Sequence, residues 1–294
     1  SAGAIPGIGR RMQVRGRIYP YGCISERINK PYFTMNFTFS KWKNWDAVKC
    51  SVNQYELIVG ISAGPRILSV RHDSGKNLLY EDDTDFRVGE WRIYGGHRFT
   101  VAPESDTSYY PDNVPCDVKV TDSTLYISAK QRPDGTRLSI VISCTSGEEG
   151  FEIQHILENN GREEWSGALW AITCVPRSAQ VFASCDTGDI HFWPGTDPAQ
   201  WQRANNQMTV KPGDFRGKAG WYSEHPMLTA VQQQGTLVID STGLSIAEAC
   251  VDNGCNTEVF VCADFAELET LSERIFVAPG ESACHLQRWR LQAW

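Results

Sequence analysis

Hydrophobic and polar residues alternate with period two along most of the chain from about Tyr55 onward. Such alternation places apolar side chains on one face and polar ones on the other, which is typical of half-buried β-strands. The runs are YELIVG, DVKVTDSTLYISAK, RLSIVISC, FEIQHIL, ALWAITCV, TLVID, TEVFVCADF and HLQRWRL. Turn-forming residues separate them, as in QRPDGTR and ENNGRE. The pattern therefore predicts an antiparallel β protein.

A helical pattern occurs only in GTDPAQWQRANN, where Thr196 or Asp197 suits the N-cap and Pro198 the first helical position. One short helix cannot supply the crossovers of an α/β fold. At 294 residues, a sandwich of this size often forms one domain. We therefore expect an all-β fold, a large antiparallel β-sandwich with at most one or two short helices, in which residues 46–294 form a single domain. Residues 1–45 are irregular and aromatic-rich, and we expect them to wrap around it.

The charge and the hydrophobic run lengths restrict the partners. The net charge is −7 and no run of lysines or arginines occurs, so we expect neither a nucleic-acid partner nor a membrane partner. No window approaches the roughly 18 apolar residues that cross a bilayer, which predicts a soluble protein. The cytoplasm is favoured, although removal of a leader before Ser1 stays open. The oligomeric state is not predicted.

The cysteines indicate buried thiols rather than a metal site. Cys144, Cys174 and Cys262 lie in apolar runs, where a free thiol behaves as a small hydrophobe. Cys250 and Cys255 form the closest pair, but no second pair repeats a zinc-ligand spacing, so no metal is expected. A disulfide between these two stays open.

The segment FAELETLS carries two carboxylates on one strand face. Alternation places Glu267 and Glu269 on the same side, roughly 7 Å apart. If that face is partly buried, repulsion and desolvation raise one pKa, so that one carboxyl holds a proton while the other accepts one. The alternative is a solvated strand face, or a glutamate paired with an arginine.

The segment YGGHRFTVAPE, residues 94–104, concentrates polar groups after two glycines. Gly95 and Gly96 indicate a bulge or a close backbone approach. If a strand follows, His97 and Arg98 point to opposite faces. A guanidinium binds sugar hydroxyls or a carboxylate, and an imidazole exchanges protons near neutral pH. The alternative is a structural pair between Arg98 and Glu104 or Asp106.

Two further histidines differ in their surroundings. His155 shares its strand face with Phe151, Ile153 and Leu157, which predicts a hydrogen-bonded core histidine. His225 follows Glu224 in a loop, where an imidazole is freer to act.

The ten tryptophans are a high number, and Trp193, Trp201 and Trp221 fall in or beside loops. An indole can cover the apolar face of a pyranose while its N–H bonds a hydroxyl. Packing in the core is the alternative for each of them. In the turn YYPDN, Asp112 is a candidate to face a ligand.

Four phrases in order carry a family resemblance: VNQYELIVGISAGPRILSVRHDSGKNLLYE, GEWRIYGGHRFTVAPE with YYPDN, FEIQHILENNGREEWSGALWAI, and AELETLSERIFVAPGESACHLQRWRL. Over about residues 45–294 the chain resembles galactose mutarotase-like proteins, in a branch distant from the true aldose 1-epimerases. The resemblance implies a β-sandwich with an open sugar-binding cleft on its concave face. It also implies that Glu269, in the tripeptide LET, is the base that takes the proton of the anomeric hydroxyl. Arg98 stands near a sugar-binding arginine, but Trp170 stands about where the acid histidine is expected.

We therefore expect a carbohydrate-active protein, most simply a sugar epimerase or mutarotase-type isomerase that acts on a mono- or oligosaccharide without a cofactor. Glu269 is the expected base, with His97 or His225 as the acid. The residues expected to bind substrate are Arg98, Glu104, Asp112, Glu267, Trp170, Trp193 and Trp221. Two alternatives stay open: a lyase or dehydratase that acts by β-elimination on a uronic or keto sugar, and a non-catalytic saccharide-binding module.

Overall fold

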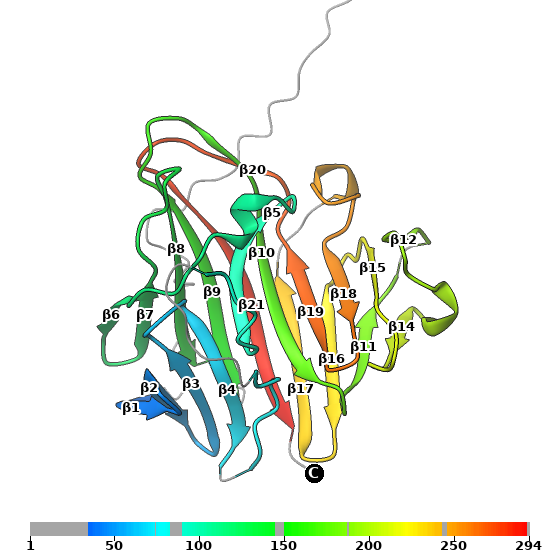
Figure 1. Cartoon of the computed structure of the whole chain (residues 1–294), viewed down its shortest axis with the longest axis horizontal. Coiled ribbons are helices and arrows are strands. Elements are labelled where there is room, and N and C mark those ends of the chain that lie inside the picture. The colour runs from blue at the N-terminus through cyan, green and yellow to red at the C-terminus, as the bar shows by residue number, and fades with distance from the viewer. Residues whose placement is uncertain are drawn as a thin grey trace, which may run out of the picture.

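The computed structural model describes residues 35–73, 75–82, 90–144, 150–186, 188–242 and 246–292. Every strand pairing within these residues is antiparallel, so the predicted antiparallel β fold is confirmed. The strands form two large sheets, and Figure 1 shows β10 and β19 of one sheet in front of β21 and β17 of the other.

The first sheet has eleven strands among the described residues, ordered β1-β2-β3-β4-β5-β10-β19-β18-β15-β12, with β20 beside β10. Their bounds are β1 Asn36–Trp42, β2 Trp45–Val52, β3 Tyr55–Gly60, β4 Arg66–His72, β5 His97–Ala102, β10 Trp165–Pro176, β12 Ile190–Phe192, β15 Gly217–Trp221, β18 Thr257–Val261, β19 Phe265–Leu271 and β20 Ile275–Val277.

The second sheet has ten strands in the described ranges, ordered β13-β14-β11-β16-β17-β21-β9-β8-β7-β6. Their bounds are β6 Asp117–Val120, β7 Thr124–Ser128, β8 Thr136–Cys144, β9 Gly150–Asn159, β11 Gln180–Ser184, β13 Gln202–Ala204, β14 Gln207–Val210, β16 Met227–Gln232, β17 Gly235–Thr242 and β21 Ser282–Gln292.

The core lies between the two sheets, where alternate residues of facing strands interdigitate. Leu268 on β19 and Ile153 on β9 both belong to this buried cluster. His155 lies there too, fully buried and hydrogen-bonded, which confirms the core role predicted for it. The inner face of the first sheet therefore packs in the core, and only its outer face is available for a functional site.

The predicted helix is only a single turn of 3-10 helix, η2 Pro198–Gln200. Asp197 caps it, because its side chain accepts a hydrogen bond from the N–H of Ala199 at 3.0 Å. The chain then extends into β13, where cross-strand pairing with β14 overrides helical propensity. The other short helical segments are η1 Asp106–Tyr109 and η3 Ala247–Ala249. Across the described ranges, no helix is long and apolar enough to span a membrane.

Part of the expected N-terminal wrap is regular structure. Residues 1–34 lie outside the described residues, but β1 begins at Asn36 and pairs with β2 along its whole length. Irregular structure was therefore the wrong prediction for residues 36–42. The strand lies at the edge of its sheet, with Phe37 packed against the core and Phe39 exposed.

Candidate functional site

Charged residues gather on the outer face of the first sheet, which points away from the second sheet. Arg98 on β5 lies opposite Ile172 on β10, and Ile172 lies opposite Glu269 on β19. Glu269 in turn lies opposite Glu258 on β18. Because directly opposed residues point to the same side of a sheet, Arg98, Glu269 and Glu258 share this face.

The two glycines before β5 allow the backbone to pass close to neighbouring backbone segments. Gly95 and Gly96 have φ values of 70° and 67°, which disfavour residues with a Cβ. A Cβ on Gly95 would collide with the carbonyl of Tyr80, and one on Gly96 with the carbonyl of Ile67. The close approach predicted from the sequence is therefore present, and it fixes which way His97 and Arg98 point.

Lys218 on β15 bridges two buried carboxylates. Its Nζ lies 2.6 Å from Glu258 Oε2 and 2.9 Å from Glu269 Oε2. The exposed fractions of the side chains are 0% for Glu258, 1% for Glu269 and 11% for Lys218. Trp170 on β10 adds a second donor, since its indole N–H bonds Glu269 Oε2 at 2.8 Å. Glu269 Oε1 accepts no hydrogen bond from the described residues.

The charges in this cluster are strongly coupled. Burial raises the pKa of Glu258 well above its usual value, with the Glu269 carboxylate adding to the rise and Lys218 opposing it. Burial alone would lower the pKa of Lys218, but the carboxylates of Glu269 and Glu258 outweigh burial and raise it. The two carboxylates therefore hold Lys218 as a cation, while burial works against the negative charge of Glu258.

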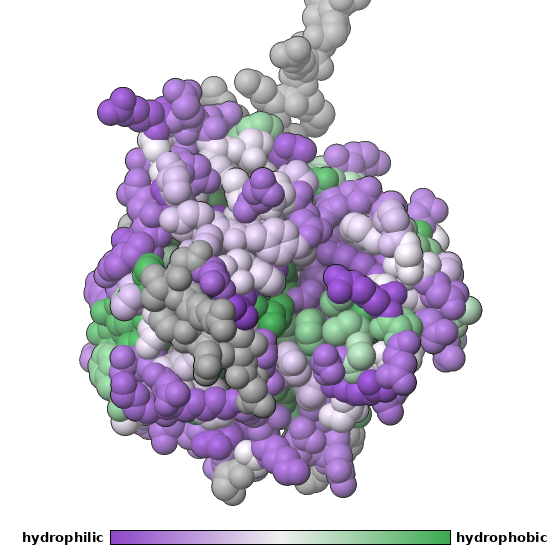
Figure 2. Space-filling model, viewed as in Figure 1, coloured by the Kyte–Doolittle hydropathy of each residue, from purple (hydrophilic) through white to green (hydrophobic). Residues whose placement is uncertain are grey.

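Aromatic rings surround the two cations on this face. Lys218 Nζ lies 4.7 Å from the ring centroid of Trp170 and 4.9 Å from that of Trp193. The Arg98 guanidinium carbon lies 5.4 Å from the Trp91 ring and 5.8 Å from the Tyr109 ring. Figure 2 shows a recess on this face, between its centre and the lobe that carries β12. Flat rings beside such a recess suit the apolar face of a sugar.

Arg98 is buried with spare donor capacity. It is 6% exposed, and one guanidinium N–H donates to the Ser108 carbonyl at 3.4 Å. Its Nε meets no acceptor among the described residues. The ion pairs considered with Glu104 and Asp106 are not formed in the described structure.

Glu267 lies on the same outer face as Glu269, two residues earlier on β19. It is half-buried, and the Cys174 thiol donates to its Oε1 at 3.7 Å. Burial raises the pKa of Glu267 to about 7, with the Glu269 carboxylate adding to the rise and Arg98 and Lys218 opposing it. One of the two glutamates on this strand is therefore able to gain and lose a proton near neutrality.

His97 was the wrong choice as an acid beside Glu269. Alternation along β5 sends it to the inner face, where it is fully buried. Its Nδ1 is hydrogen-bonded to Thr173 Oγ1 at 2.9 Å and its Nε2 to His155 Nε2 at 2.8 Å. Burial lowers the pKa of His97 to about 3, and nearby positive groups add to the effect. The ring is neutral and lies across the sheet from Glu269.

Trp221 was also wrongly assigned to the cleft. It is 1% exposed and belongs to the core cluster, because it shares the inner face of β15 with Ala219. Its indole N–H donates to the Ser184 carbonyl at 2.5 Å. His225, in contrast, is exposed between β15 and β16. No hydrogen bond or ion pair joins it to Glu269 in the described part of the chain.

Asp112 and Glu104 have structural partners. Asp112 Oδ1 accepts a hydrogen bond from the fully buried Arg66 at 3.2 Å, which corrects its assignment as a ligand-binding residue. Glu104 is exposed and accepts a hydrogen bond from the hydroxyl of Tyr109, whose ring lies beside Arg98. Glu104 therefore lies at the rim of the aromatic group rather than in the charged cluster.

Sequence reasoning missed Lys218 and Glu258, the two closest partners of the site. Each is a charged residue inside a short apolar strand, which is the one available signal. Strand pairing brings them to Glu269, and that pairing cannot be read from spacing along the chain. Trp170, expected as a sugar contact, instead holds Glu269 directly.

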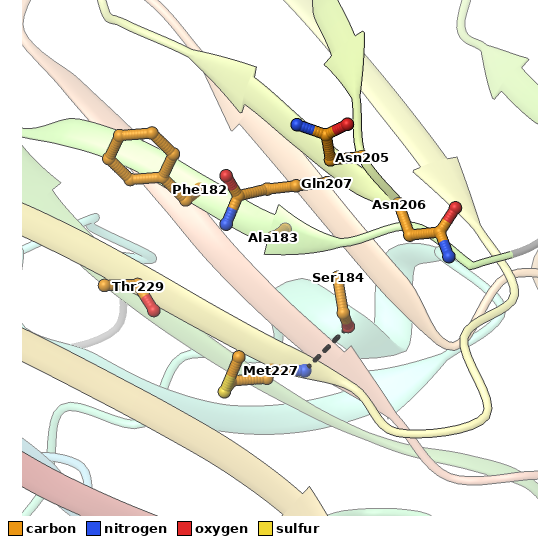
Figure 3. Close-up of a pocket in the computed structure, with 8 residues that line it drawn as sticks. All are labelled: Phe182, Ala183, Ser184, Asn205, Asn206, Gln207, Met227 and Thr229. Carbon is orange, nitrogen blue, oxygen red and sulfur yellow. Dashed lines mark hydrogen bonds between the residues drawn. The ribbon is translucent and has the colours of Figure 1, made fainter.

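Other features lie away from this cluster. In the described residues, no group of three His, Cys, Asp or Glu side chains is placed to hold a metal ion. Cys250 and Cys255 are not joined by a disulfide, and the Cys250 thiol donates to the Ile246 carbonyl at 3.6 Å. A pocket of about 250 Å³ lies on the second sheet, against β11, β14 and β16 (Figure 3). In it Ser184 Oγ accepts a hydrogen bond from the N–H of Met227, and Phe182 and Gln207 line its wall.

Comparison with solved structures identifies the fold. A proposed mutarotase from Salmonella typhimurium matches with a TM-score of 0.59 at 12% identity, over 88% of this chain and 94% of that one. A proposed aldose 1-epimerase from Klebsiella pneumoniae matches with a TM-score of 0.59 at 10% identity, over 85% of this chain and 80% of that one. A galactose mutarotase-like protein from Lactobacillus casei matches with a TM-score of 0.57 at 10% identity, over 84% and 100%.

No protein-family profile matches the sequence, and no curated protein matches it. The structural matches nevertheless show that the chain has the galactose mutarotase-like fold. At these identities the likeness defines the architecture, and the chemistry has to be argued from the site itself.

Proposed function

We propose that the chain is a carbohydrate isomerase of the epimerase or mutarotase type, with its site on the outer face of β10, β19, β18 and β15. The observation that carries the proposal is the Glu269 carboxylate, buried between the Trp170 indole N–H and the Lys218 ammonium. Both donors act on Oε2, and within the described part of the chain Oε1 has unused accepting capacity. A sugar hydroxyl is the kind of donor that this oxygen lacks.

The surrounding groups suit a polyhydroxylated ligand. Trp193 is half-buried beside Lys218, so its indole is able to cover an apolar sugar face. The Nε–H of Arg98 meets no acceptor among the described residues, and its guanidinium suits a ring or hydroxyl oxygen. Arg98 and Glu269 lie two strand spacings apart, or about 10 Å, which a pyranose and its substituents can bridge.

In this proposal the Glu269 carboxylate accepts the proton of the anomeric hydroxyl on Oε1, the oxygen that meets no donor among the described residues. Lys218 is held positive by two carboxylates, and it stabilises negative charge that develops on the sugar oxygen. Since Glu269 is 1% exposed, substrate binding requires the Lys218 side chain to shift from above it.

A non-catalytic saccharide-binding site is the second candidate. It is favoured by the same burial, because a carboxylate tied to an ammonium is a weak base unless the pair opens. It is also favoured by the absence, within the described residues, of a histidine that touches Glu269.

The decisive experiment adds the protein to freshly dissolved α-D-glucose, α-D-galactose and α-D-mannose and follows anomer exchange by optical rotation and NMR. We expect the protein to accelerate anomer exchange of at least one sugar, and we expect Glu269→Gln to abolish this acceleration. Glu164→Gln makes the same chemical change at an exposed glutamate and should leave the acceleration unchanged. Binding without acceleration supports the second candidate and rejects the first. If the protein instead converts a uronic acid to an unsaturated product that absorbs ultraviolet light, the isomerase proposal is rejected in favour of β-elimination.

A further inference from the structure

Glu267 and Glu269 present two carboxyl groups to the same outer face of β19. Their Cα atoms are two strand residues apart, which is roughly 7 Å. Leu268 lies between them and points into the core. The anomeric oxygen and the ring oxygen of a pyranose are both bonded to C1, so two carboxyls at this separation are able to converge on them from one side.

The two carboxyls have different neighbours. Glu269 is held by two donors, the Lys218 ammonium and the Trp170 indole N–H. Glu267 is contacted by the Cys174 thiol, a weak donor, and lies directly opposite Phe260 on β18. Glu267 is also half-buried, whereas the side chain of Glu269 is only 1% exposed and paired with Lys218.

We infer that Glu267 is the general acid of this site, in the place where related enzymes are expected to use a histidine. The inference rests on the proposed isomerase function and goes beyond it by naming the second proton-transfer group. Glu267 protonates the ring oxygen while Glu269 takes the proton of the anomeric hydroxyl.

The proton transfers balance without an added reagent. The bond between C1 and the ring oxygen breaks, the ring oxygen gains the proton of Glu267, and the anomeric hydroxyl gives its proton to Glu269. C1 becomes a carbonyl carbon, and the bond between C1 and C2 rotates. Ring closure reverses both transfers: the hydroxyl that becomes the ring oxygen gives its proton to Glu267, and Glu269 gives its proton to the carbonyl oxygen. Both glutamates return to their starting states, so neither an oxidant nor a reductant is needed.

The other titratable groups that face Glu267 are unsuited to this role. Burial raises the pKa of Tyr109 to about 12, and burial also raises the pKa of the Cys174 thiol. Lys218 is held as a cation by its carboxylates, and Arg98 keeps its charge. The pKa of Glu267, raised to about 7, matches a group that donates and recovers a proton near neutrality.

The test measures anomer exchange as a function of pH for the sugar of the panel that the wild type converts fastest. Wild-type kcat/KM should fall above about pH 7, because the acid loses its proton. Glu267→Gln should lower kcat by about 10²- to 10⁴-fold and leave KM nearly unchanged. It should also abolish the fall in kcat/KM at high pH, which is the basic limb of the pH profile. Glu267→Asp should keep the limb with reduced kcat, and Glu164→Gln should behave as wild type. Circular dichroism establishes that each variant is folded.

The outcomes separate the two proposals. If the wild type and Glu267→Gln are equally active, or if the basic limb persists in Glu267→Gln, the assignment of Glu267 is overturned while the isomerase proposal stands. If the wild type accelerates none of the three sugars, the isomerase proposal fails and the assignment fails with it. Should Glu267→Gln not fold, loss of the basic limb in Glu267→Asp would overturn the assignment, and its retention would support it.

Discussion

Replacing Lys218 by methionine should destabilise the protein by about 3–5 kcal/mol at neutral pH. The substitution keeps the apolar stem but removes the ammonium that lies 2.6 Å from Glu258 and 2.9 Å from Glu269. Removing one partner of a buried ion pair leaves an uncompensated buried charge, for which losses of this size are typical. Solvent screens these ion pairs only weakly, because the Lys218 side chain is only 11% exposed.

The loss should depend on pH in a defined direction. Without the ammonium, the pKa of a buried carboxyl rises further above its unfolded value near 4.3, so the folded variant binds about one more proton than the folded wild type. A raised carboxyl pKa gives stability that is present below the unfolded pKa and lost as pH rises. The difference between variant and wild type should therefore grow by ~1.4 kcal/mol per pH unit above about pH 5.

The assay is denaturant unfolding followed by tryptophan fluorescence at several pH values between about 5 and 8, with linear extrapolation to water. Lys211→Met serves as the control, because Lys211 is exposed and its loss should change stability by no more than about 0.5 kcal/mol. A Lys218→Met protein that loses under about 1 kcal/mol, or whose stability runs parallel to wild type across this range, would refute the buried ion-pair cluster.

Two further predictions concern single hydrogen bonds and buried rings. Trp170→Phe removes the indole N–H that bonds Glu269 at 2.8 Å, and should lower the free energy of unfolding by about 1–3 kcal/mol; a change below about 0.5 kcal/mol contradicts this bond. His285 has its pKa lowered to about 4 by burial, so its stabilising effect is present above the unfolded value of 6.5 and is lost as pH falls through 4. His285→Gln should therefore remove ~1.4 kcal/mol per pH unit from the slope of stability between these values, as measured by denaturant unfolding at several pH values, and an unchanged slope contradicts this.

Much of the fold was predictable because strand alternation is a local property. The runs at residues 55–60 and 265–271 coincide with β3 and β19. Short or glycine-rich strands such as β12, β13 and β15 escaped notice, because three to five residues show too little alternation to identify. The helix at residues 195–206 was overestimated for a related reason, since a good cap is local while the pairing of β13 is not.

The candidate site was predicted only in part. Glu269 and Glu267 were found because their relation lies within one strand. The opposite directions of His97 and Arg98 were also foreseen, but which of the two faces the core depends on the neighbouring strands. Lys218 reaches Glu269 across β18, a relation set by strand order, and strand order is a property of the whole chain.

Strand β19 runs between β10 and β18, with acidic and apolar side chains on alternate sides. If it slipped by a single residue during folding, Leu268 would turn toward solvent and both glutamates would be driven into the dry interior. Such a mispaired chain would bury two charges without partners, at a cost of several kcal/mol each. The alternation of acids and apolar residues on β19 thus disfavours mispaired assembly of the sheet.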